Sequence, residues 1–69
     1  MVDEQTVDKV LAFLKKTDRP LTLNEIIASL NMRENEVIDA LHYLVKVGVV
    51  KGFLREDKGK LKAVYVFLG

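Results

Sequence analysis

A chain of 69 residues, 49% hydrophobic and 30% charged, has room for one domain and the composition of a folded protein. Eleven basic residues against ten acidic ones give a net charge of +1, which excludes a strongly basic body that binds nucleic acid indiscriminately. The absence of cysteine excludes disulfides and thiolate metal sites. With no apolar run of membrane-spanning length and no signal-peptide pattern, we expect a single domain over residues 1–69, cytoplasmic and without membrane association.

The first predicted element is a helix over residues 3–16. Its buried stripe follows helical spacing and consists of Val7, Val10, Leu11 and Leu14. Phe13 lies beside this stripe and either covers the edge of the core or meets another subunit. Pro20 indicates a turn over residues 17–20, and Leu21 is expected to form a short strand that pairs with a later hairpin.

Two helices follow, separated by a tight turn. Thr22 and Glu25 have the spacing of a capping box at the start of the first helix, and Asn31 tolerates the left-handed conformation that ends it. The apolar stripe of this helix comprises Leu23, Ile26, Ile27 and Leu30. The second helix, over residues 34–47, has its own inward stripe of Val37, Ala40, Leu41 and Leu44. Gly48 is placed to terminate it.

Residues 49–55 and 61–68 have the β-branched and aromatic content of strands. The intervening Asp57 and Gly59 predict a three-residue hairpin loop that pairs Arg55 with Leu61 and Phe53 with Ala63. The last strand is apolar on both faces, so its inward face is either Val64, Val66 and Leu68 or Ala63, Tyr65 and Phe67. The expected fold is α+β, in the order helix, short strand, helix, helix, strand, strand.

This order resembles the winged helix-turn-helix family, and its ArsR- and MarR-like regulators most nearly. The resemblance covers nearly the whole chain and rests on the stretch LTLNEIIASLNMRENEVIDALHYLVKVGVVKG, a basic hairpin and the closing VYVFL. It implies three helices and a C-terminal β-hairpin, called the wing. The same fold serves both DNA readers and protein adaptors.

The resemblance implies that the third helix enters the major groove of double-stranded DNA while the wing contacts the backbone. The residues expected to contact DNA are Arg33, Asn35, His42, Lys46, Arg55, Lys58, Lys60 and Lys62. Glu34, Glu36 and Asp39 on the same helix oppose this function, because acidic side chains repel phosphates. On a helix surface these carboxylates are better explained as solvated charges near a helix N-terminus than as a catalytic pair.

The surplus of apolar surface suggests a partner, and we expect a homodimer. Its candidate interface residues are Phe13, Phe53, Tyr65 and Phe67. The leading hypothesis is a small DNA-binding transcriptional regulator of a prokaryote or a prokaryotic virus. The alternative is a winged-helix interaction module that docks in a larger protein complex without touching DNA. With one histidine, His42, and one serine, Ser29, we expect no catalytic site, no metal and no cofactor.

Overall fold

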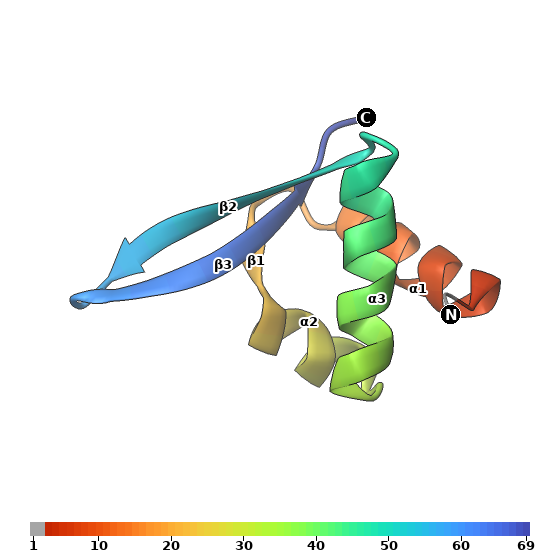
Figure 1. The fold of residues 1–69 in the computed structure, drawn as a ribbon, viewed down its shortest axis with the longest axis horizontal. Helices are drawn as coiled ribbons and strands as arrows, with labels where there is room; N and C mark the ends of the chain where they lie inside the picture. Colours follow the sequence, from red (N-terminus) through yellow and green to blue (C-terminus); the bar gives the residue numbers. More distant parts are fainter. Residues whose placement is uncertain (1–2) are drawn as a thin grey trace.

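The computed structural model describes residues 3–69 and has the predicted order of elements. The helices are α1 (Glu4–Lys16), α2 (Leu23–Leu30) and α3 (Glu34–Lys46), and the strands are β1 (Leu21–Thr22), β2 (Val50–Asp57) and β3 (Lys60–Phe67). Figure 1 shows the three helices gathered at one end, with the long β2–β3 hairpin projecting away from them. None of the described helices is long and apolar enough to cross a bilayer.

Helix α1 begins one residue later than predicted, because Asp3 caps it. The Asp3 carboxylate accepts hydrogen bonds from the backbone N–H of Gln5 at 3.2 Å and from the hydroxyl of Thr6 at 3.3 Å. This second bond lets Thr6 lie buried beside the apolar stripe, a core position that the periodicity did not reveal. Phe13 is half-buried and packs on the core, so within the chain it covers the core's edge.

The caps of α2 are those the sequence predicts. The backbone N–H of Thr22 donates to the Glu25 carboxylate at 3.0 Å, and the backbone N–H of Glu25 donates to the Thr22 hydroxyl at 3.2 Å. The first of these bonds is the main reason that the pKa of Glu25 lies below its usual value. Asn31 ends the helix at φ 52°, in the left-handed region.

Helix α3 packs on the other two through the predicted stripe. Val37, Ala40 and Leu41 are fully buried and Leu44 nearly so. The helix is capped by Val47, and Gly48 follows at φ 86°, a conformation that favours glycine. The chain then turns into β2, with the N–H of Val49 bonded to the carbonyl of Leu44 at 3.2 Å.

The three strands form one antiparallel sheet in the order β1-β3-β2. The predicted pairing of Leu21 with the hairpin is confirmed, since Leu21 lies opposite Tyr65. The predicted hairpin register is wrong by one residue. Arg55 lies opposite Lys62 and Phe53 opposite Val64, because the loop has two residues rather than three.

The two loop residues explain the register. Lys58 and Gly59 both have positive φ, 53° and 78°, as in the two-residue turn whose twist matches that of the flanking strands. The sequence pattern assigned only the glycine to the left-handed region. Because side chains alternate along a strand, this single-residue difference changes which residues of β2 and β3 share a face.

Strand β3 is central, which explains why it is apolar on both faces. Tyr65 and Phe67 pack against the helical core, so the face that also carries Ala63 is the inward one. On the other face Val64 is fully buried between its cross-strand neighbours Thr22 and Phe53. The second face of β3 is therefore covered within the chain at this position, whereas Leu68 beyond the strand is left 57% exposed.

Candidate nucleic-acid interface

The outer surface of α3 presents four polar side chains in one line. Asn35, Asp39, His42 and Lys46 are all exposed and follow the i, i+4, i+7, i+11 spacing opposite the buried stripe. Arg33, the residue that precedes the helix, is also exposed and makes no side-chain cap bond. The structure thus puts all four of the α3-region residues predicted to contact DNA on the solvent side.

Two of the three acidic residues of α3, Glu36 and Asp39, border the side that faces α1, whereas Glu34 does not. Glu36 and Asp39 border a small depression against the start of α1, together with Asp3 and Thr6. His42 and Lys46 border a different cleft, on the side of the wing. These two carboxylates therefore border α1, Asp39 also lying in the outward line, and no carboxylate is among the described residues that line the cleft beside the wing.

The wing has two different faces. Residues paired across an antiparallel ladder lie on the same face, and faces alternate along each strand. One face carries the pairs Arg55–Lys62 and Asp57–Lys60 toward the tip, and the pair Phe53–Val64 and Lys51 toward the base. The other face carries Leu54 opposite Ala63 and Glu56 opposite Leu61. Toward its tip the wing is thus basic on one face and largely apolar on the other.

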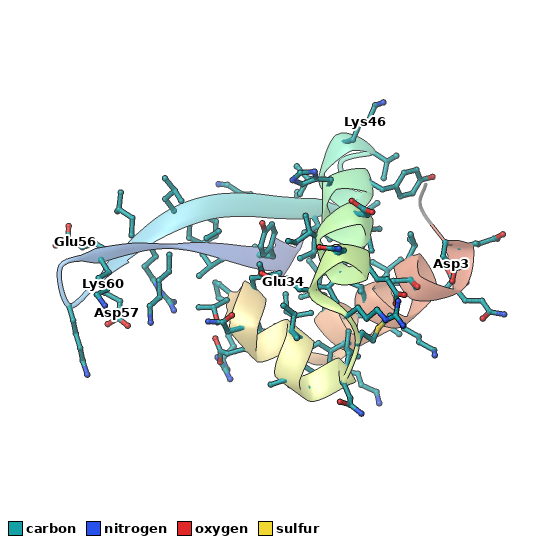
Figure 2. The ribbon with its side chains drawn as sticks, turned by 60° about the horizontal axis from the view of Figure 1, so that its bottom comes forward. Asp3, Glu34, Lys46, Glu56, Asp57 and Lys60 are labelled. Atoms are coloured by element: carbon teal, nitrogen blue, oxygen red, sulfur yellow. The ribbon has the colours of Figure 1, made fainter. Side chains whose placement is uncertain are left out.

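The basic face keeps most of its charge free. Lys62 forms an ion pair with Asp57, Nζ to Oδ2 at 3.3 Å, with both side chains about half exposed at 48%. Such exposed pairs stabilise a fold by only about 0–1 kcal/mol, so this one can exchange partners readily. Figure 2 shows Lys60, Glu56 and Asp57 near the end of the wing, at a distance from the helices. Lys58 occupies the turn itself.

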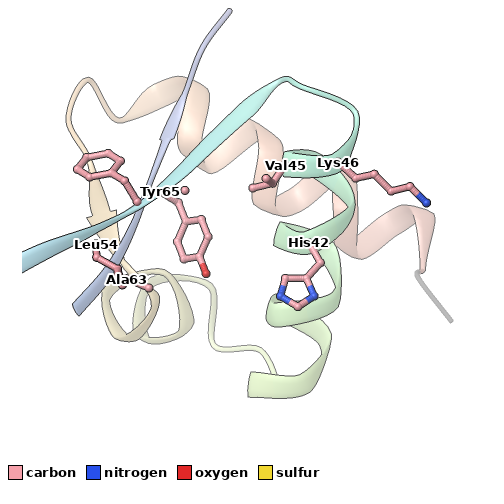
Figure 3. A pocket seen from close by; sticks show the side chains of 8 residues that line it. His42, Val45, Lys46, Leu54, Ala63 and Tyr65 are labelled. Atoms are coloured by element: carbon pink, nitrogen blue, oxygen red, sulfur yellow. The ribbon is translucent and has the colours of Figure 1, made fainter. Parts of the chain in front are cut away.

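The apolar face of the wing meets α3 in an open cleft of about 410 Å³, which we call the wing cleft. It is lined by His42, Val45, Lys46, Gly52, Phe53, Leu54, Ala63 and Tyr65. Figure 3 shows the Tyr65 ring projecting from the sheet toward α3, where the His42 ring extends into the same space. Gly52 permits this arrangement, because a Cβ there would lie 3.1 Å from Cε1 of Tyr65.

The structure therefore brings some predicted residues together and separates others. His42 and Lys46 share the wing cleft with apolar residues of the hairpin. Arg55, Lys60 and Lys62 point to the opposite face of the wing. Val45, Leu54 and Ala63 were not predicted as site residues. For Leu54 and Ala63 the signal that would have found them is the two-residue loop, which puts them on one face with Leu61.

The predicted interface residues are largely used within the chain. Phe13, Tyr65 and Phe67 are half-buried against the core, and Lys15 lies over the Phe67 ring with Nζ 5.5 Å from its centre. Phe53 is 36% exposed, and Nζ of Lys51 lies 5.8 Å from its ring centre. Their role in a dimer stays a prediction, since these contacts are internal to one chain.

Three helices, a tight turn before an exposed helix and a projecting antiparallel hairpin define the winged helix-turn-helix fold. Similar solved structures include Stf76 from the Sulfolobus islandicus plasmid-virus pSSVx, with a TM-score of 0.80 and 19% identity, over 90% of this chain and 79% of that chain. A possible transcriptional regulator from Methanosarcina mazei Go1 has a TM-score of 0.79 and 14% identity, over 99% of this chain and 57% of that one.

A third similar structure belongs to HOP2, from work on its DNA recognition and protein interaction domains. Its TM-score is 0.76 at 20% identity, over 90% of this chain and 97% of that chain. No protein-family model matches the sequence, and no curated protein matches it significantly. At these identities the similarity establishes the fold, which the sequence resemblance predicted, and leaves the function to be argued from the surface.

Proposed function

We propose that this protein is a small DNA-binding transcriptional regulator, nearest to the ArsR- and MarR-like regulators in its sequence pattern. Helix α3 would lie in the major groove of double-stranded DNA and the wing on the neighbouring backbone. The observation that carries the proposal is the exposed line Asn35–Asp39–His42–Lys46 on α3 beside a projecting hairpin with five basic and two acidic residues between positions 51 and 62.

The chemistry of the α3 line suits the reading of base edges. Asn35 can form two hydrogen bonds with adenine and Arg33 two with guanine, while His42 can donate to a base or a phosphate. The placement of Glu36 beside α1 supports this, because it keeps that carboxylate off the line that would face the bases, whereas Asp39 lies within the line and opposes close approach to phosphates. The possible transcriptional regulator agrees with this class of function, and HOP2, described by both DNA recognition and protein interaction domains, is compatible with it.

The wing would supply sequence-independent affinity. Lys58 and Lys60 at its end and Arg55 on its basic face can each neutralise a phosphate, and the Lys62–Asp57 pair is weak enough to open. A few phosphate contacts in one small domain give weak binding, so we propose that the protein acts as a homodimer that doubles them. Neither part of this proposal requires a metal, a cofactor or catalysis.

The experiment compares two double charge reversals with equal change in net charge. Lys58→Glu with Lys60→Glu alters the wing, whereas Lys9→Glu with Lys16→Glu alters exposed positions of α1. Fluorescence anisotropy with random duplex at low salt should show binding by the wild type and the α1 variant and at least about tenfold weaker binding by the wing variant. Equal weakening in both would mean that only net charge matters, and no binding by the wild type at high micromolar protein would overturn the proposal.

A second candidate function is a protein-interaction module without direct DNA contact. The apolar face of the wing favours it, because Leu54, which lines the wing cleft, and Leu61, nearer the turn, are 66% and 69% exposed. In that case the wing charge reversal leaves partner binding intact, whereas polar substitutions at these two leucines abolish it.

A further inference from the structure

A second groove lies on the opposite side of α3 from the wing, between α1 and the end of α3. Figure 1 shows α1 and the hairpin on different sides of α3. The groove measures about 500 Å³ and is lined by Glu4, Val7, Asp8, Leu11, Tyr43, Leu44, Val47 and Val49. Tyr43 and Val47 are 46% and 51% exposed there. It holds none of the residues predicted to contact DNA.

Helix α1 has an ordered charge pattern along the side that borders this groove and beyond it. Glu4, Asp8, Leu11 and Lys15 follow the i, i+4, i+7, i+11 spacing and form one line along the helix, which we call the α1 stripe. Its first half is acidic, its centre is leucine and its end is basic. Asp8 and Lys15 are exposed and neither takes part in an ion pair among the described residues, while the Lys15 ammonium lies 5.5 Å from the centre of the Phe67 ring.

The charge pattern of the α1 stripe is complementary to that of a second copy of the stripe that runs in the opposite direction. Two copies of α1 packed antiparallel about a two-fold axis near Leu11 and Ala12 bring Asp8 of each copy level with Lys15 of the other. The same operation brings Leu11 of both copies together, next to the exposed Tyr43 and Val47. An isologous dimer requires this property, since one patch must match itself.

We propose that the α1 stripe, with Tyr43 and Val47, is the surface through which two copies of this chain form a two-fold dimer. The inference rests on the homodimer in the proposed function and gives it a location, and it does not depend on DNA binding. Because the groove and the wing flank α3 on different sides, this arrangement leaves the outer line of α3 and the basic wing uncovered in both copies.

The test uses charge reversals measured by light scattering at low salt, without DNA. Asp8→Lys places two lysines opposite each other at both symmetry-related contacts, and Lys15→Glu places two carboxylates there. Each variant alone should dimerise about tenfold more weakly than the wild type or worse. An equimolar mixture should recover dimers, because the lysine introduced in one variant then faces the glutamate introduced in the other, while the unchanged Lys15 and Asp8 face each other. The Asp8→Lys/Lys15→Glu double variant should recover dimers too.

The mixture separates this proposal from a structural effect, because a variant that simply folds poorly is not rescued by another variant. Circular dichroism checks the fold of each protein. Dimers that persist in both single variants, or a mixture that stays monomeric, overturn the α1 interface. A wild type that is monomeric at millimolar concentration overturns both the α1 interface and the homodimer. DNA binding is tested separately, by fluorescence anisotropy with duplex DNA.

Discussion

Lys58 is the residue whose backbone conformation determines the geometry of the wing. At φ 53° it occupies a region that costs an ordinary L-residue roughly 1 kcal/mol, and it precedes Gly59, which adopts φ 78° freely. Asparagine is the common choice at this position of a two-residue turn, because its side chain tolerates positive φ. The presence of lysine where asparagine fits better is consistent with a role for its charge.

Lys58→Asn should therefore raise the free energy of unfolding by about 0.5 kcal/mol through relief of backbone strain. Under the proposed function the same change should also weaken binding to duplex DNA, because the proposed contact of Lys58 with a phosphate is lost. Urea denaturation and fluorescence anisotropy measure the two effects. If the free energy of unfolding and the affinity for duplex DNA both fall in this variant, the assignment of Lys58 as a strained but functional residue is contradicted.

The exposed leucines of the wing carry a prediction that distinguishes the two candidate functions. Leu54 and Leu61 are mostly exposed, so Leu54→Ser with Leu61→Ser should change the free energy of unfolding by no more than about 0.5 kcal/mol per site. If the protein is a DNA reader, affinity for duplex should change little. Loss of binding to a partner protein, with DNA affinity absent throughout, would favour the interaction module.

At the scale of elements, α2 depends on its caps because it has only eight residues. Thr22→Ala removes the hydroxyl that accepts the N–H of Glu25 and should lower the free energy of unfolding by about 1 kcal/mol. Thr22→Ser keeps the hydroxyl and serves as the matched control. Thermal denaturation of the two variants measures the difference, and equal midpoints would show that the cap contributes nothing.

Glu25 adds a dependence on pH to the same cap. Its pKa is lowered in the folded protein, chiefly by the hydrogen bond from the backbone N–H of Thr22, so its contribution is present above the ordinary carboxyl pKa. That contribution is lost as the pH falls through the lowered pKa of the folded state. Glu25→Gln should flatten this part of the curve of stability against pH, and an unchanged acid limb would contradict the assignment.

The caps also show which features of the fold are predictable from sequence. The start of α2 at Thr22, its end at Asn31 and the end of α3 at Gly48 follow from signals within a few residues, and all three agree with the structure. The hairpin register depends instead on whether Lys58 accepts a left-handed conformation, which residue type alone does not decide. Because the conformation of Lys58 fixes the register, it also determines that the basic residues and the exposed leucines lie on opposite faces of the wing.

At the scale of the whole molecule, the distribution of charge over the surface indicates more about the binding surface than the net charge does. The chain is nearly neutral, yet Glu36 and Asp39 of α3 border α1 while basic groups gather on the wing. The sequence pattern predicted that Arg33, His42 and Lys46 face outward, and all three are exposed. It could not predict that the wing cleft is apolar, because the cleft combines residues of α3, β2 and β3 that meet only in the folded chain.

The most direct test of DNA binding through the wing is the dependence of affinity on salt, measured by anisotropy with one duplex between about 50 and 200 mM salt. The proposal predicts that affinity falls steeply with salt and that Lys60→Gln reduces the slope of the log–log plot by about one for each phosphate contact removed, whereas Lys9→Gln on α1 leaves it unchanged. Equal slopes for wild type and Lys60→Gln, or affinity that does not respond to salt, would contradict it.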